Sequence, residues 1–282
     1  MGKMNSTIKK EKLGAGRLVI YIILILGCVI TLAPFLWMFL TSFKTQVEAV
    51  SIPPTILPRQ WVVTAYTTLK DKIPFFLMYW NTIITSVITV AGQLLFCSLA
   101  GYAFARIHFP GRNVLFILCL SVLMIPPSFF ILPQYIIIQR LDLSNTLHAI
   151  YLPNLFSAFG TFLMRQFFMA LPKELEEAAR IDGCGHGRVF GRIMLPLVKP
   201  GLVSLGILTL RFSWNNLMWP LIINTSTEKM TLTAGLSFLQ GQYLSDYPAI
   251  MAGALLAVIP LIVLFAIFQR QFIAGIAFTG IK

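Results

Sequence analysis

The chain has 282 residues, of which 57% are hydrophobic and 11% charged, and its mean hydropathy is +0.81. Because a soluble domain has about 25% charged residues, this composition excludes a soluble globular protein and indicates a chain that crosses a membrane several times. The net charge of +12 does not indicate nucleic-acid binding, because the basic residues are spread over short segments beside apolar runs, as in cytoplasmic loops on anionic lipid.

Six charge-poor runs are long enough to span a bilayer, which takes about 20 residues each. They are Leu18–Phe43, Ile73–Ala105, Asn113–Gln139, Leu143–Met164, Pro200–Thr227 and Tyr247–Gln269. The second run exceeds the length of one span, so we expect its start, with Tyr79 and Trp80, to lie at the outer interface. The predicted fold class is therefore an all-α polytopic membrane protein with six transmembrane helices.

The first run follows a basic N-terminal tail, residues 1–17, and has to be distinguished from a signal peptide. Ile25 to Cys28 have a faint likeness to a lipoprotein cleavage box, but the apolar run continues to Leu40 with no polar mature segment behind it. We therefore expect a retained first transmembrane helix, residues 18–43. The cysteines do not form a disulfide framework and are interpreted as small packing residues: Cys28, Cys97, Cys119 and Cys184.

The charges of the loops predict the topology. With a cytoplasmic N-terminus, 15 of the 22 Lys and Arg residues lie on the inner side, six lie outside and Arg211 lies in the membrane. This bias places the tails 1–17 and 271–282 and the loop after the fourth span in the cytoplasm. Residues 44–78 then form an extracytoplasmic loop, and residues 79–270 form a core of five helices. Pro53, Pro54 and Pro58 predict an extended loop, which with the segment after Asn224 offers an outer docking surface.

Prolines are expected to interrupt three of the six runs. Pro126, Pro127 and Pro133 are expected to break the third span, Pro153 the fourth and Pro260 the sixth. Each one alone is explained by a harmless kink. Broken helices are tolerated in a membrane where neighbours or a water-filled cavity satisfy the freed carbonyls, so three interrupted spans together favour a translocation pathway.

A polar, charge-rich interval, Leu171–Gly201, separates the fourth and fifth spans. The pattern predicts a helix over Pro172–Asp182, with Pro172 in the first helical position and glutamates in the first turns. Glu176 and Arg180 have the spacing of a helical ion pair, and Gly183 is placed to end the helix. Leu175, Ala178, Ala179 and Asp182 would form a nearly flat face. A second short helix, roughly Arg188–Met194, would lead to Leu195 and Pro196.

This predicted helix has two interpretations. It could rest on lipid headgroups with its charges solvated, or it could dock another protein against its small-residue face. The acidic start and an apolar face that is small rather than bulky favour docking.

The sequence contains no catalytic constellation. His108, His148 and His186 lack metal-ligand spacing, and no GxxxxGK[ST] phosphate loop is present. The glycine-rich segment GCGHG follows no predicted strand and is interpreted as a turn. We therefore expect a protein that is not an enzyme and binds no cofactor or metal.

The fifth run contains four polar or amphipathic side chains that are unusual for a membrane span: Arg211, Trp214, Asn215 and Asn216. A charge inside a membrane is costly unless it meets water or a partner. Indole rings and amides are what a sugar-lining surface would use, so these four residues are candidates for a substrate pathway. The alternative is interfacial anchoring by Trp219 with hydrogen bonds between helices from the asparagines.

The chain resembles the permease subunits of ABC importers. Glu177-Ala178-Ala179, then Gly183, then Ile193, Leu195 and Pro196 match the cytoplasmic EAA loop of that family. The segments GYAFAR (101–106) and FPGR (109–112), with Trp214-Asn215 and Trp219-Pro220-Leu221, resemble the carbohydrate-uptake branch, in particular the maltose-transporter MalG-like subunit. The resemblance runs from about Leu18 to the C-terminus.

The resemblance implies a type I importer fold in the inner membrane of a bacterial or archaeal cell. It implies two ABC ATPase subunits that use ATP and Mg, a second permease subunit and an extracytoplasmic sugar-binding protein. The EAA loop, residues 171–197, would couple to the ATPase through Glu177, Ala178, Ala179, Asp182, Gly183, Ile193, Leu195 and Pro196. The tail Ala274–Lys282 would reach toward the ATPase dimer as well.

The sequence departs from the family pattern at Cys184, where a small residue is usual, and at Arg211, which leaves room for an anionic sugar. Two alternatives stay open. One is an ABC permease for another solute. The other is half of an ion-coupled secondary transporter, for which the spans offer only His148 and no acidic residue.

Overall fold

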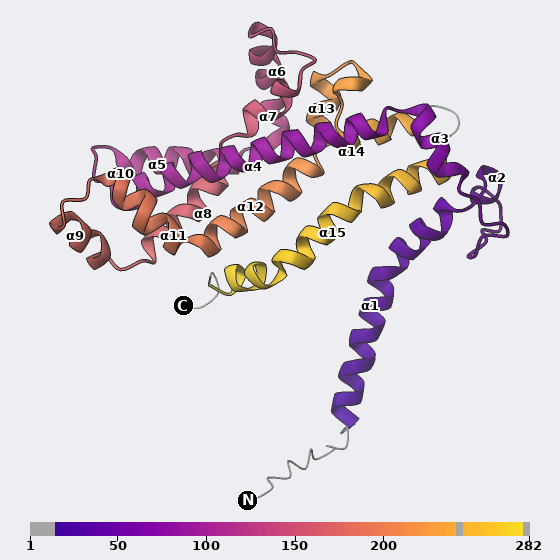
Figure 1. Ribbon diagram of the computed structural model, residues 1–282, viewed down its shortest axis with the longest axis horizontal. Coiled ribbons are helices and arrows are strands. Elements are labelled where there is room, and N and C mark those ends of the chain that lie inside the picture. Colours follow the sequence, from indigo (N-terminus) through magenta and orange to yellow (C-terminus); the bar gives the residue numbers. More distant parts are fainter. Residues whose placement is uncertain (1–14, 241–244, 279–282) are drawn as a thin grey trace, which may run out of the picture.

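Figure 1 shows the computed structural model, in which residues 15–240 and 245–278 are described, with side chains at 16, 18–240 and 245–269. All regular elements in these residues are helices, and a single bridge pairs Gln240 with Ser245. The predicted all-α class is therefore confirmed. Most of the N-terminal tail and the C-terminal contact predicted for Ala274–Lys282 lie outside the described side chains.

The elements follow one another in chain order. The first part of the chain contains α1 (Ala15–Ser42), α2 (Gln46–Ala49), α3 (Thr64–Lys72) and the long α4 (Phe75–Arg106). The middle contains α5 (Arg112–Ser121), η1 (Val122–Met124), η2 (Pro127–Phe130), α6 (Ile131–Arg140), α7 (Leu147–Tyr151), η3 (Leu152–Asn154) and α8 (Ala158–Met169). Next come α9 (Glu174–Ile181), α10 (His186–Val189), the π-helix η4 (Phe190–Met194), α11 (Leu195–Leu197) and α12 (Lys199–Trp214). The last are α13 (Met218–Ile223), η5 (Thr227–Lys229), α14 (Leu232–Leu236), η6 (Ser237–Leu239) and α15 (Tyr247–Phe278).

Three helices in the described residues are long and apolar enough to cross a membrane: Leu18–Ser42, Phe75–Arg106 and Tyr247–Gln269. Three bent pairs raise the number of candidate spans to as many as six, which agrees with the number of runs in the sequence, although the third pair begins before the predicted fifth run. The pairs are Arg112–Met124 with Pro127–Arg140, bent by 103°, Leu147–Asn154 with Ala158–Met169, bent by 43°, and His186–Leu197 with Lys199–Trp214, bent by 78°.

The prolines were only partly predictive. Pro126 and Pro127 lie at the sharpest bend, and Pro153 lies in η3 just before the second bend. Pro133, however, lies inside α6 and Pro260 inside α15, so the prediction that these two break their spans was wrong. Pro133 is the third residue of its helix, where the N–H has no intrahelical partner to lose. At Pro260 one missing donor does not end a 32-residue helix that contacts α1, α3 and α12.

Two predicted boundaries also change. The second run is one helix, α4, whose 32 residues extend about 48 Å at 1.5 Å per residue. The fifth span does not continue to Thr227, because α12 ends at Trp214 and α13 is a separate short helix. Past the end of α12, the Asn215 side chain donates to the Arg211 carbonyl at 2.9 Å. Trp219 of α13 is buried and donates to the Ala149 carbonyl at 2.8 Å, so it is not an interfacial anchor.

Helix α4 lies at the centre of the helical body and carries a stripe of buried polar side chains from Asn81 to Gln93. Gln93 donates from Nε2 to the Asn154 carbonyl at 2.9 Å, and its Oε1 accepts hydrogen bonds from Ser157 (3.1 Å) and Thr209 (2.8 Å). One side chain therefore joins α4 to η3, to the start of α8 and to α12. Polar groups remote from water need such partners, so the stripe fixes how these helices pack around α4.

Helix α1 leaves this body, as Figure 1 shows, and contacts α15. The side chains from Leu18 to Leu36 are exposed on all sides of the helix. This part of α1, whose apolar side chains are not covered by the described residues, faces lipid or another chain.

Residues 44–78, which were predicted to form an extracytoplasmic loop, fold into a defined segment at one end of α4. The proline-containing stretch 50–63 is free of helix, as predicted, but α2 and α3 flank it. The Glu48 carboxylate accepts hydrogen bonds from the Arg59 amide (2.8 Å) and the Thr55 hydroxyl (2.9 Å). The Arg59 amide is the main cause that lowers the pKa of Glu48 below its usual value. Lys72 forms an ion pair with Asp246 at 2.6 Å, which joins this segment to the start of α15.

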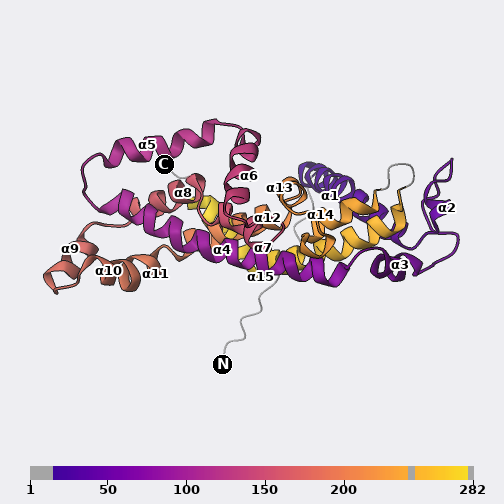
Figure 2. The same cartoon turned by 90° about the horizontal axis from the view of Figure 1, so that it is seen from above.

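The two ends of the molecule are different in kind. In Figure 1, α2 and α3 lie at one end of α4, and the polar segment α9–α11 lies at the other. Figure 2, at right angles to this view, shows the same separation along the long axis. The polar segment predicted from the sequence therefore forms one whole end of the helical body.

Candidate functional site

The polar end is built around the short helix α9. It covers Glu174–Ile181, with Lys173 as its N-cap and Asp182 as its C-cap. The prediction that Pro172 takes the first helical position was wrong, because Pro172 precedes the cap. Gly183 has φ of +79° directly after the cap, which confirms the predicted helix end in the left-handed conformation that glycine adopts without cost.

After the turn, the chain regains helix earlier than predicted. Helix α10 begins at His186 and continues into the π-helix η4 and then α11, where Arg188–Met194 had been expected as one short helix. Of the predicted coupling residues on this part, Ile193 and Leu195 are half-buried and Pro196 is exposed.

Helix α9 has an inner and an outer side. Glu176 and Ala179 are buried, with 7% and 6% of their surfaces exposed, whereas Glu177, Ala178 and Asp182 are exposed. The predicted flat face is therefore divided, because Ala179 packs inward and its neighbours face outward. The Glu177 carboxylate forms no hydrogen bond or ion pair with any side chain in the described part of the chain.

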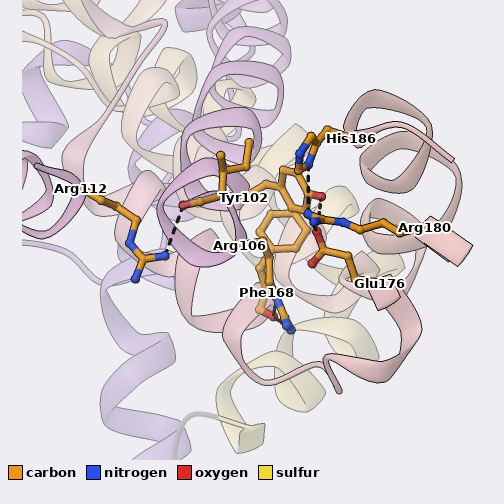
Figure 3. A network of polar contacts seen from close by, with 8 residues as sticks. Tyr102, Arg106, Arg112, Phe168, Glu176, Arg180 and His186 are labelled. Carbon is orange, nitrogen blue, oxygen red and sulfur yellow. Dashed lines mark hydrogen bonds and ion pairs between the residues drawn. The ribbon is translucent and has the colours of Figure 1, made fainter. Parts of the chain in front are cut away.

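Glu176 holds the inner side of α9 in the network of Figure 3. Its Oε1 accepts a hydrogen bond from the Tyr102 hydroxyl at 3.1 Å and one from Arg180 Nη2 at 2.9 Å. The latter confirms the predicted helical ion pair. Arg180 also lies 3.3 Å from Nδ1 of His186 at the start of α10. The sequence showed the Glu176–Arg180 spacing, but it gave no sign that Tyr102, in α4, completes the group.

Arg106, one turn further along α4, holds the preceding loop. Its guanidinium donates from Nε to the Phe168 carbonyl at 3.1 Å and from Nη2 to the carbonyls of Phe168 and Leu171. These carbonyls belong to the end of α8 and the residues that follow it. The Tyr102 ring packs against Phe168 and Phe190 with centroids 5.5 and 5.2 Å apart. The segment GYAFAR is thus the internal support of the polar end.

The residues predicted for a substrate pathway are separated by the structure. Arg211 and Asn215 line a cavity of about 1010 Å³ between α4, α12 and α15, whose other walls are apolar. Trp214 is 4% exposed and donates to the Ala257 carbonyl at 3.0 Å, so it packs inside the protein in this conformation. Asn216 is half-buried. The Arg211 guanidinium has no ion-pair or hydrogen-bond partner among the described residues.

The described residues contain no cluster of three or more His, Cys, Asp or Glu side chains that could hold a metal ion. In the described part of the chain, the surface of α9 therefore presents the exposed Glu177 carboxylate, while Glu176 on the inner side is bonded to Tyr102.

Up to six candidate spans in the described residues, together with one structured polar end, define a multi-pass membrane protein. A family described as the binding-protein-dependent transport system inner membrane component matches residues 94–277. The chain belongs to this family and is an inner-membrane protein.

The similar proteins are transport permeases. The chain is 38% identical over 264 residues to the arabinooligosaccharides transport system permease protein AraQ of Halalkalibacterium halodurans, covering 90% of this chain and 92% of that protein. It is 34% identical over 261 residues to the sn-glycerol-3-phosphate transport system permease protein UgpE of Salmonella typhi, covering 90% and 93%.

Among solved structures, the chain is similar to a chain of a bacterial ABC transporter involved in the import of the acidic polysaccharide alginate. The TM-score is 0.79 at 23% identity, and the match covers 90% of this chain and 95% of the other. The fold is therefore that of an ABC importer transmembrane domain, which confirms the predicted fold.

Proposed function

We propose that this chain forms half of the translocation pathway of an ABC importer for a carbohydrate. Two ATPase subunits that use ATP and Mg bind the α9–α11 end, which lies in the cytoplasm with both termini. A second permease subunit completes the pathway, and a sugar-binding protein docks at the outer end formed by α2, α3 and the segment before α15. The chain itself binds no cofactor and hydrolyses nothing.

One observation carries this proposal: Glu177 is exposed and unpaired among the described residues, on a helix whose inner side is bonded to α4 through Glu176 and Tyr102. A carboxylate without an internal partner, exposed beside the small Ala178, can meet a basic group of another protein in a cleft. A helix resting on headgroups carries mainly Lys and Arg on its polar face, whereas the first turn of α9 carries three glutamates. The family membership supports the same partner, and the similarity to AraQ supports a carbohydrate.

The function is tested by purifying the tagged chain from native membranes and identifying what is retained. We expect two ATPase subunits and a second permease to co-purify, and the reconstituted complex to import arabino-oligosaccharides when ATP is supplied inside. Retention of no ATPase, or uptake driven by an ion gradient without ATP, would contradict the proposal.

An anionic substrate is the second candidate, favoured by Arg211. Its charge faces a mostly apolar cavity without an internal partner, and such a charge is stabilised by an anion from the substrate or from a neighbouring chain. The similarity to the sn-glycerol-3-phosphate permease UgpE also supports an anionic substrate.

The two candidates are separated by an Arg211→Ala variant. If the substrate is anionic, uptake of sn-glycerol 3-phosphate by the assembled transporter should fall by roughly tenfold or more, the equivalent of one charge-assisted hydrogen bond, while uptake of neutral arabino-oligosaccharides changes little. Asn215→Ala, at the same cavity, is the matched control for loss of a neutral group. Equal effects of Arg211→Ala on both solutes would exclude the anionic candidate.

A further inference from the structure

Two adjacent glutamates of α9, Glu176 and Glu177, have different surroundings. Glu177 faces outward without a partner, whereas Glu176 is buried and bonded to Tyr102 of α4 and to Arg180. The proposed docking function uses only Glu177. A buried carboxylate is costly unless it is fully partnered, so the position of Glu176 requires the end of α4 to stay against α9.

A second link joins α9 onward to α10. It passes through Gly183, Gly185 and Gly187, where an added Cβ would meet open space. The turn is crossed by the hydrogen bond from the Cys184 amide to the Ala179 carbonyl (2.9 Å) and by the Arg180–His186 contact at 3.3 Å. Ala179 also packs in one buried cluster with Val189 and Met194, so this link is mainly apolar, whereas the link to α4 includes the buried hydrogen bond Tyr102–Glu176.

On the α4 side, a force on α9 meets a rigid element. Tyr102 is 3% exposed and its ring is fixed between Phe168 and Phe190. One turn away, Arg106 fixes the end of α8. Nine residues before Tyr102, Gln93 joins α4 to η3, α8 and α12 through buried hydrogen bonds.

We propose that the pair Tyr102–Glu176 is a clamp that makes α9 and α4 move as one body, so that movement of the docked helix reaches the translocation pathway through α4. Glu176 is a positioning residue in this scheme and does not touch the ATPase. The inference rests on the proposed function and adds the route by which the docking helix acts on the spans.

The clamp is tested in the purified complex with its ATPase subunits, in nanodiscs. Spin labels replace Leu99 on α4 and Ile181 on α9, both exposed (44% and 87%) and outside the network, in a chain whose four cysteines are removed. The distance between the labels is measured without nucleotide and with ATP under conditions that block hydrolysis. With the clamp intact, the distance distribution should be the same in both states.

The matched variants are Glu176→Ala and Glu177→Ala. With Glu176→Ala the ATPase should be retained, but the label distance should shift on ATP addition or its distribution should widen by about twofold, because α9 moves without α4. Tyr102→Phe, which removes only the hydroxyl, should shift it less and in the same direction. With Glu177→Ala the ATPase should be lost and the distance should stay at its nucleotide-free value.

A merely structural role of Glu176 would lower thermal stability without an ATP-dependent change in distance. The clamp is overturned if ATP alters the distance in the unsubstituted complex, or if Glu176→Ala and Tyr102→Phe both keep one ATP-independent distance. Failure of the proposed function gives a different result, since no ATPase would then be retained by the unsubstituted chain.

Discussion

Replacing Glu177 with Lys is expected to abolish ATP-driven uptake and to release the ATPase subunits from the membrane complex. The side chain is exposed on the outer side of α9 and has no partner among the described residues, so the bond that we propose to a basic group of the ATPase would be its one strong polar contact. A charge-assisted hydrogen bond in a shielded cleft contributes about 1.5–3 kcal/mol. The lysine loses this contribution and adds repulsion against the same basic group.

The measurement is the amount of ATPase that co-purifies with the tagged chain, together with uptake into proteoliposomes. Glu174→Lys is the matched control, because it changes the charge by the same amount on an exposed position of the same helix. We expect Glu174→Lys to keep most of the ATPase. Normal uptake by Glu177→Lys would remove α9 from the coupling mechanism.

The local features of this end were predictable from the sequence. The position of α9, its end at Gly183 and the pair Glu176–Arg180 all depend on residues within one or two turns. Which glutamate faces inward was not predictable, because it depends on Tyr102, 74 residues earlier in the chain. A helix with glutamates at positions 174, 176 and 177 offers several equivalent acceptors, and only the packing of α4 against α8 selects one of them.

The ends of the membrane spans could not be predicted from the sequence either. Hydropathy located the apolar runs, but lipid-facing and protein-facing positions are both apolar in a membrane. The pattern therefore gave no reason for α12 to end at Trp214, where the Trp214 and Trp219 side chains turn inward to the carbonyls of Ala257 and Ala149. The stripe from Asn81 to Gln93 was a usable signal, because its polar residues recur at helical spacing on one side of α4.

Replacing Gly101 with Ala is expected to reduce strongly the amount of folded protein. Gly101 lies where α4 crosses α8, and a Cβ there would be 2.7 Å from Met164 Cβ and 2.9 Å from the backbone nitrogen of Arg165. A backbone atom cannot rotate away, so the two helices must separate. Overpacking of this kind typically costs about 1–3 kcal/mol. The shift would also disturb Tyr102 and Arg106, which lie within the next turns and support α9.

Gly206→Ala is the matched control within the same helical body. A Cβ at Gly206 would meet only side-chain atoms of Leu94 and Val90 at 3.9–4.0 Å, which is ordinary contact. Because alanine also favours a helix by about 0.5–1 kcal/mol over glycine, this variant should be as stable as the unsubstituted protein or slightly more so. The midpoint of thermal unfolding of the detergent-solubilised chain, followed by loss of the monodisperse peak in size-exclusion chromatography, compares the two. Equal midpoints for Gly101→Ala and Gly206→Ala would show that α4 and α8 do not approach as closely at Gly101 as the packing of the polar end requires.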